Sequence, residues 1–283
     1  MPGKIDPFAH VVDSDHIGIF DSINWKIEGL EIGGLPLKFI LLITFCAIGV
    51  AIALIWLGGK MKTGEPPTGK LWNLLESLLF FVRDKIARPG VGMHDADRYL
   101  PYLATLFLFI FAMNLIGMVP FLGSPTAAIP VTIALAFVSF CVIHVSGIQE
   151  NGFGGYIKTF VPHIELEGGA GMQLFGGTIK WGMAVLEYAT AFIRAGILAV
   201  RLFANMLAGH TVLFMILFFI ALVDHPAYKL PIAQDWMYWG VMPFSVVLVV
   251  ALSLLELFIA GLQAFIFTFL TAVFIGLAKH PPH

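Results

Sequence analysis

Charged residues are scarce in this chain. Asp, Glu, Lys and Arg together make up 12% of its 283 residues, whereas apolar residues make up 59%. Soluble domains carry roughly 25% charged and about 45–50% apolar residues. A large soluble enzyme with this composition would lack the polar surface needed to cover its core, but a surface in contact with lipid needs few charges. The composition therefore predicts an integral membrane protein.

The chain also lacks a basic excess, a cysteine framework and a cleavable signal sequence. Its net charge of −2 shows none of the basic excess that is typical of nucleic-acid-binding proteins. The two cysteines, Cys46 and Cys141, lie within apolar runs and predict neither a disulfide nor a metal site. The first apolar run begins near Leu37, after an acidic and polar leader, so we expect no signal peptide and no organelle transit sequence. No cofactor is expected.

Long apolar runs are abundant instead, and they set the expected topology. A spanning helix needs about 20 apolar residues. Two of the runs are about twice that long, and about 40 helical residues would reach ~60 Å against a ~30 Å hydrocarbon core. No turn sequence divides them, which favours two long, tilted helices forming an antiparallel hairpin. The expected segments are an outside leader (1–36), spans at 37–57, 99–122 and 127–148, an inside loop (149–172), and long spans at 173–223 and 236–278.

One further helix is expected at the membrane surface. Within the charged stretch 58–100, apolar residues recur at helical spacing, while Glu76, Arg83 and Asp84 lie elsewhere on the wheel. This pattern favours an amphipathic helix at 70–87 lying in the interface. Because the stretch is rich in Lys and Arg, it marks the inner side, which places the C-terminus inside after five crossings. The fold class predicted is thus an all-α integral membrane protein with about five transmembrane helices and one interfacial helix.

Ionisable side chains within spans are costly and are functional candidates. In the first long segment, Glu187, Arg194 and Arg201 are spaced seven residues apart, and Asn205 follows four residues after Arg201. Spacings of seven and four keep these side chains on one face of a helix. His210 lies nine residues beyond Arg201, on roughly the same side. The first long span therefore carries a polar stripe.

The last span carries a matching stripe. Glu256 and Gln263 are again seven residues apart on one face. In an antiparallel hairpin, residues at equal depth have position numbers with a nearly constant sum. The expected pairs are Arg201 with Gln263, His210 with Glu256, and Glu187 with Lys279. The pattern predicts a polar pathway, with the His210–Glu256 layer about 14 Å outward of the arginine and Glu187 about 21 Å inward.

Ordinary structural roles remain alternatives for part of this set. Arg194 could form a plain ion pair with Glu187, and the two amides, Asn205 and Gln263, could join helices by hydrogen bonds. His144 in the third span and Asn114 in the second are secondary candidates, for which packing is an equally good explanation.

Four stretches point to one family. They are AVRLFANMLAGH (199–210), LQAFIFTFLTAVFIGLA (262–278), MNLIGMVPF (113–121) and DPFAHVVDS (6–14). In order and in content they resemble subunit a of F-type rotary ATP synthases, over nearly the whole chain. The first two motifs are highly specific. Two positions depart from the family pattern: Pro130 stands where many members carry Asn, and Ala195 where many carry Pro.

The resemblance implies a non-catalytic, proton-translocating stator subunit. Its partners would be a ring of c subunits, each with a buried carboxylate, together with the subunit b stalk, the remaining synthase subunits and the lipid bilayer. The essential arginine maps onto Arg201 and the inner polar path onto Glu187. The outer half-channel maps onto Asn205, His210, Glu256 and Gln263. A bacterial plasma (inner) membrane is the expected location, with the mitochondrial inner membrane as the alternative.

Three other functions compete with this interpretation. A sodium-coupled version of the same subunit remains open, because the ion-binding site belongs to the ring. A stand-alone transporter would need internal repeats or broken helices at mid-membrane, and the sequence shows no repeat. A structural scaffold would leave the depth-matched polar residues without an explanation.

Overall fold

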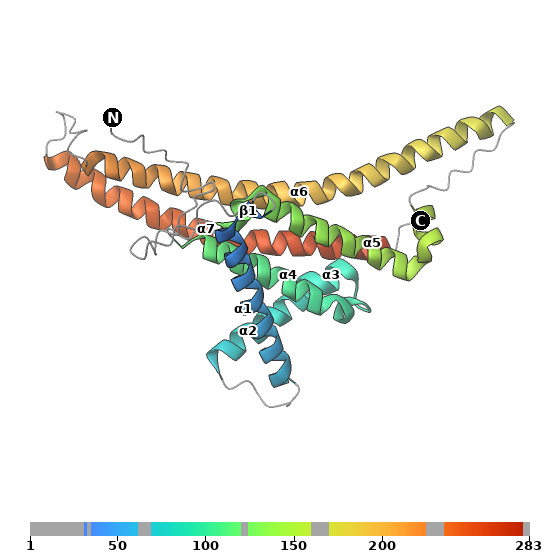
Figure 1. Cartoon of the computed structure of the whole chain (residues 1–283), viewed down its shortest axis with the longest axis horizontal. Coiled ribbons are helices and arrows are strands. Elements are labelled where there is room, and N and C mark those ends of the chain that lie inside the picture. Colours follow the sequence, from blue (N-terminus) through green and yellow to red (C-terminus); the bar gives the residue numbers. More distant parts are fainter. Residues whose placement is uncertain are drawn as a thin grey trace. The chain divides into compact units, whose positions relative to one another are not determined.

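The computed structural model describes residues 31–32, 35–61, 69–119, 124–159, 170–224 and 235–279 (Figure 1). In this part of the chain the structure is helical, apart from one two-residue antiparallel strand pair. The helices are α1 (Leu37–Met61), α2 (Lys70–Val82), the π-helix η2 (Arg83–Ala87), α3 (Arg88–Val91), α4 (Ala96–Gly117), the 3₁₀ turn η3 (Pro125–Ala127), α5 (Ile129–Thr159), α6 (Ala170–Asp224) and α7 (Asp235–Lys279). The strands are β1 (Glu31–Ile32) and β2 (Leu35–Pro36).

Five of the described helices are long and apolar enough to cross a membrane. Their spanning stretches are Phe39–Met61, Ala96–Gly117, Ile129–Tyr156, Tyr188–Leu213 and Pro243–Lys279. The last two belong to helices of 55 and 45 residues. The predicted all-α integral membrane fold is thereby confirmed. Helix α6 passes Ala195, where many resembling sequences carry a proline, without interruption.

The inside loop predicted at 149–172 is largely helical in its described part. Helix α5 continues to Thr159, with one kink at Gly152 (φ 70°), and α6 already begins at Ala170. The chain stays helical past Ile148 because Asn151 donates hydrogen bonds both to Gly147 O in its own helix and to the final carbonyls of α7. Tertiary contacts of this kind override a Gly-rich composition, which alone favours a loop.

Between the first two spans, the residues from Lys70 to Val91 form one continuous helical run. Helices α2, η2 and α3 follow one another from Lys70 to Val91. Arg83 binds Asp97 through two hydrogen bonds of 2.7 Å, and this contact raises the pKa of Arg83. Apolar residues at the start of the run face outward, with Leu71 71% and Leu74 57% exposed. An exposed apolar face is what an interfacial helix needs, and the location at the interface stays a prediction.

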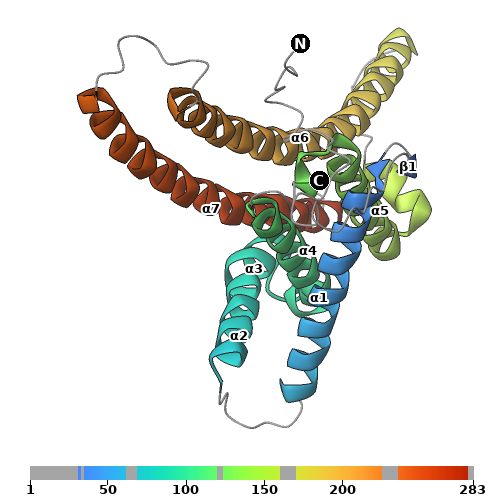
Figure 2. The same cartoon turned by 60° about the vertical axis from the view of Figure 1, so that its left-hand side comes forward.

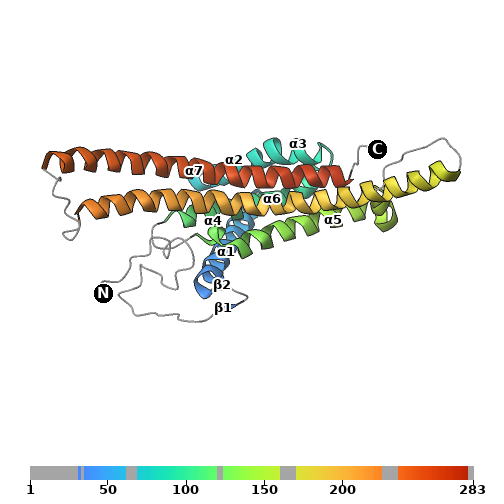
Figure 3. The same cartoon turned by 90° about the horizontal axis from the view of Figure 1, so that it is seen from above.

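The chain divides into two compact units. Unit 1 gathers residues up to Ile52, Leu108–Thr132 and Arg201–Ala264. In it the later half of α6 and the first part of α7 run antiparallel (Figure 3). Ala127, Met206 and Ala260 form a buried apolar cluster in it, with Met118 packed against them. The polar residues of α6 from Arg201 onward and those of α7 up to Gln263 lie in the same unit.

Unit 2 gathers Ala53–Phe107, Ile133–Val200 and the chain from Phe265 onward. Helix α2 lies beside the last turns of α1 (Figure 2), where Trp56 and Trp72 meet edge to face at 6.5 Å between ring centroids. Phe81 on α2 contacts Phe265 on α7, with 5.8 Å between centroids. The final turns of α7 are thus packed against the run from α2 to α3.

Candidate functional site

The two polar stripes meet along α6 and α7 in unit 1. Nδ1 of His210 lies 3.2 Å from Oε1 of Glu256, so the predicted pairing of these residues is found in the structure. Asn205 Nδ2 donates a hydrogen bond of 2.8 Å to Gln263 Oε1. The two helices therefore present two polar layers to each other, one charged or titratable and one made of amides.

The partner of Gln263 differs from the one that spacing predicted. We expected Arg201 level with Gln263, but the hydrogen bond comes from Asn205, one helical turn farther along. The register fixed by His210 and Glu256 places position 203 level with Gln263. Arg201 and Asn205 then flank it equally, and the amide makes the contact. Arg201 is left half-exposed on the same face of α6 as the small residue Ala208, which is exposed.

Several polar atoms in these layers are buried without a hydrogen bond. Glu256 is 5% and Gln263 2% exposed. Among the described residues, no hydrogen bond reaches either carboxylate oxygen of Glu256, Nε2 of His210 or Nε2 of Gln263. Buried polar groups in folded proteins nearly always have a partner. Orphaned atoms of a carboxylate and an imidazole within one layer mark a place that can accept a proton or bind water.

A third helix, α4, supplies a further polar side chain to unit 1. Asn114 is fully buried, and its Nδ2 donates a hydrogen bond of 3.2 Å to Ala260 O. Ala260 lies between Glu256 and Gln263 on α7, so the amide is held against the same stretch of that helix. Its Oδ1 is buried without a hydrogen-bond partner in the described part of the chain. Asn114 is thus placed among the polar layers, as a secondary candidate.

A glycine makes room for the Glu256 carboxylate. A Cβ added at Gly209 would lie 2.9 Å from Glu256 Oε1 and 3.2 Å from its Cδ. Position 209 adjoins His210, so a side chain there would push the carboxylate away from the imidazole. Sequence spacing missed this residue because glycine carries no polar signal.

We therefore expect Gly209→Ala to move the Glu256 carboxylate away from the His210 imidazole while the chain still folds. A displacement of about 1 Å can cost about 100-fold in the rate of a reaction that depends on such a pair. Ion flux across vesicles that contain the protein measures the effect. Gly196→Ala is the matched control, since no described atom lies within 4 Å of a Cβ built there. Equal rates in both variants would show that the position of the Glu256 carboxylate does not matter.

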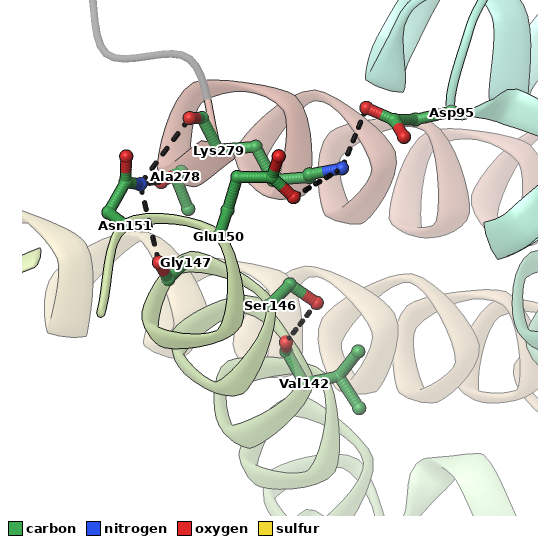
Figure 4. A network of polar contacts seen from close by, with 8 residues as sticks. All are labelled: Asp95, Val142, Ser146, Gly147, Glu150, Asn151, Ala278 and Lys279. Carbon is green, nitrogen blue, oxygen red and sulfur yellow. Dashed lines mark hydrogen bonds and ion pairs between the residues drawn. The ribbon is translucent and has the colours of Figure 1, made fainter. Parts of the chain in front are cut away.

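The two inner candidates, Glu187 and Arg194, lie in unit 2. Arg194 is exposed, with its Cζ 5.4 Å from the ring centroid of Phe274 on α7. The side chain of Glu187 lies outside the described residues, so its predicted ion pair with Arg194 stays a prediction. The prediction that Glu187 and Lys279 lie at equal depth stays a prediction for the same reason. Lys279 contacts Asp95 and Glu150, whose carboxylates both reach the end of α7 (Figure 4).

His144 sits among aromatic rings in the same unit. Its Nδ1 lies 2.9 Å from Phe140 O, one turn earlier on α5. Its ring lies edge-on to Tyr156 and Tyr188, at 5.9 and 6.3 Å between centroids. Nε2 is buried, and no hydrogen bond reaches it from the residues that the structure describes. Packing explains the ring, while the orphaned nitrogen keeps His144 a secondary candidate.

These features define a class of protein. Five spans with buried, incompletely paired polar layers inside them are typical of membrane proteins that translocate ions. No group of three or more His, Cys, Asp or Glu suited to a metal ion occurs among the described residues.

Comparison with known proteins gives the family. The sequence profile of the ATP synthase A chain matches residues 40–276. An ATP synthase subunit a of Myxococcus xanthus is 38% identical over 264 residues, which cover 91% of this chain and 78% of the relative. One of Chloroherpeton thalassium is 33% identical, covering 100% and 79%. One of Chlorobium phaeobacteroides is 31% identical, covering 97% and 76%. The chain belongs to the ATP synthase A chain family, a non-catalytic, ion-translocating subunit of the membrane sector.

Proposed function

We propose that this chain translocates protons through two offset half-channels that meet a rotating ring of c subunits at Arg201. The observation that carries the proposal is the buried His210–Glu256 contact of 3.2 Å with its orphaned polar atoms. An imidazole beside a carboxylate is suited to proton relay, because imidazole is the side chain whose ordinary titration range covers neutral pH.

The outer half-channel would run along α6 and α7. A proton entering from outside would reach the layer of His210 and Glu256, and then the amides Asn205 and Gln263. The amides bond each other at 2.8 Å and cannot hold a net charge, so they orient the path and leave the titrating step to the first layer. The proton would then load an ionised carboxylate of the ring.

Arg201 would separate the two half-channels. A guanidinium stays charged in proteins, so it attracts an ionised ring carboxylate and repels a cation that moves straight from one side to the other. Its half-exposed place on α6 leaves it accessible to a partner helix. A neutralised ring carboxylic acid can face lipid and turn with the ring, until it releases its proton on the inner side, at the path to which we assign Glu187 and, secondarily, Arg194.

The partners and location follow from this mechanism. The chain would bind the c-ring through the face of α6 that carries Arg201, and subunit b and the remaining synthase subunits elsewhere. Its relatives named above are bacterial, and we assign it to a bacterial plasma (inner) membrane. One charge moving through 100 mV releases about 2.3 kcal/mol. Several translocation steps per ATP are therefore needed, and rotation adds them up.

The ion itself is tested with the purified complex in liposomes. An imposed pH gradient without sodium should drive ATP synthesis, and a protonophore should abolish it, because the His210–Glu256 layer holds titratable groups. ATP formation is measured by luciferase luminescence, with a sodium gradient at constant pH as the matched control. Synthesis that required sodium and survived the protonophore would replace the proton by sodium.

A further inference from the structure

The last residue of α7 carries a buried ammonium group. The side chain of Lys279 is 1% exposed, with Nζ 2.7 Å from Asp95 Oδ2 and 3.1 Å from Glu150 Oε2 (Figure 4). The ammonium also lies 5.5 Å from the ring centroid of Tyr99. Burying a charge is unfavourable unless opposite charges compensate it. Here the two carboxylates come from different elements, the turn before α4 and helix α5.

The backbone of α7 is held at the same point. The last carbonyl groups of a helix have no partner within the helix. Asn151 on α5 supplies one, because its Nδ2 lies 3.1 Å from Ala278 O and 3.4 Å from Lys279 O. Helix α5 therefore binds both the side chain and the main chain of the end of α7 (Figure 4).

A third contact comes from α3. A Cβ added at Gly90 would lie 2.6 Å from Cβ of Ala272, and one added at Gly276 would collide with the carbonyl oxygen of Gly90. The backbones of α3 and α7 thus touch directly. With the ion pairs and the Asn151 contact, this fixes the end of α7 from three sides within unit 2.

One residue of the inner candidate set depends on this arrangement. Phe274 lies five residues before Lys279 on α7. Its ring centroid is 5.4 Å from Cζ of Arg194. Arg194 is exposed, and among the described residues its guanidinium packs against α7 at the ring of Phe274, so the place of Phe274 affects where that guanidinium lies. A shift of α7 along its axis would move Phe274 away from Arg194.

We propose that Lys279 is a positioning residue that fixes the inner end of α7, and through Phe274 the place of Arg194, by bridging Asp95 and Glu150. The part concerning Arg194 rests on the proposed function, since it assigns Arg194 to the inner proton path. The ammonium of Lys279 contacts a carboxylate before α4 and a carboxylate of α5 at the same time, which neither a neutral side chain nor a single ion pair would do. The lysine therefore does more than balance two carboxylates.

The test uses the intact ATP synthase complex in lipid nanodiscs and in vesicles. Lys279→Met keeps most of the length of the side chain and removes its charge. The triple variant Lys279→Met, Asp95→Asn, Glu150→Gln neutralises the two carboxylates as well, so the test still gives a result if the single variant fails to assemble. Lys85→Met, at an exposed lysine of η2, is the matched control. Amide hydrogen exchange of the peptide 265–279 and protons pumped per ATP hydrolysed are both measured.

We expect exchange in this peptide to rise by about tenfold or more in the triple variant, because local opening governs exchange. Protons pumped per ATP should fall, with subunit content and the Lys85→Met complex unchanged. Wild-type exchange in the triple variant would mean that Lys279 only balances charge, and would overturn the proposal. Raised exchange with normal pumping would overturn the role through Arg194. If the wild-type complex pumped no protons, the proposed function would fail, while the exchange comparison would still decide the positioning role.

Discussion

Arg201→Ala should abolish coupled ATP synthesis while the complex still assembles. The guanidinium is the charge that would draw an ionised ring carboxylate to this face of α6. Two unit charges about 4 Å apart attract by about 4 kcal/mol at an effective dielectric constant of 20, and about 1.4 kcal/mol corresponds to tenfold. Loss of that attraction should slow the loading of the ring by roughly three orders of magnitude. ATP synthesis should then fall to the background rate.

The measurement is ATP synthesis in inverted vesicles, together with ATP-driven proton pumping by the same preparation. Arg201→Lys separates charge from shape, because an ammonium is a compact point charge and lacks the planar fork of a guanidinium. It should retain partial pumping. Arg98→Ala is the control, since Arg98 is exposed and contacts the ring of Tyr99 at 5.9 Å. An Arg201→Ala complex that pumped protons at the full rate would refute the assignment of Arg201.

Glu256→Gln has the second-largest expected effect. The amide fills the same space 3.2 Å from His210 but cannot take up or release a proton. Positioned proton transfer is worth about 10²–10⁴-fold in rate, so proton flow should fall by about 100-fold or more. The readout is passive proton conduction in membranes stripped of the soluble ATPase head. Ser253→Ala, whose hydroxyl bonds Val249 O on the same helix, is the matched control.

A swapped pair tests whether the two residues act as a unit. In His210→Glu with Glu256→His, the imidazole and carboxylate exchange helices but remain in one layer. Proton conduction should return to within about tenfold of the wild-type rate, because a relay needs both groups in contact. The effects of mutating two residues in contact are not additive, so the second substitution can compensate for the first. Conduction in the double variant no better than in Glu256→Gln would contradict a relay made by these two residues.

The paired layers could be read from the sequence because helices repeat regularly. Seven-residue spacing gave the shared face of Glu256 and Gln263, and antiparallel register gave the pairing with His210, which is found at 3.2 Å. Register from spacing is accurate to about one turn, which is why Asn205 and not Arg201 bonds Gln263. The roles of these residues in proton transfer remain predictions.

Contacts between distant segments could not be read in the same way. Nothing in the spacing of Lys279 indicates Asp95 or Glu150, since both carboxylates lie in stretches that composition assigns to loops. Gly209 and Gly276 matter through the side chains they lack, which only neighbouring atoms reveal. Asn114 was a secondary candidate because a lone amide in a span has no periodicity, and its bond to Ala260 O needs the packing of α4 against α7.

The direct backbone contact between α3 and α7 has a consequence for how this subunit can diverge. No side chain fits at Gly276 beside the carbonyl of Gly90, and a Cβ at Gly90 would meet Ala272. A replacement at one of these positions could be accommodated only if the facing backbone moved. Relatives that keep the contact should therefore vary at these three positions jointly or not at all, which ties sequence change in the short helix α3 to sequence change in the transmembrane helix α7.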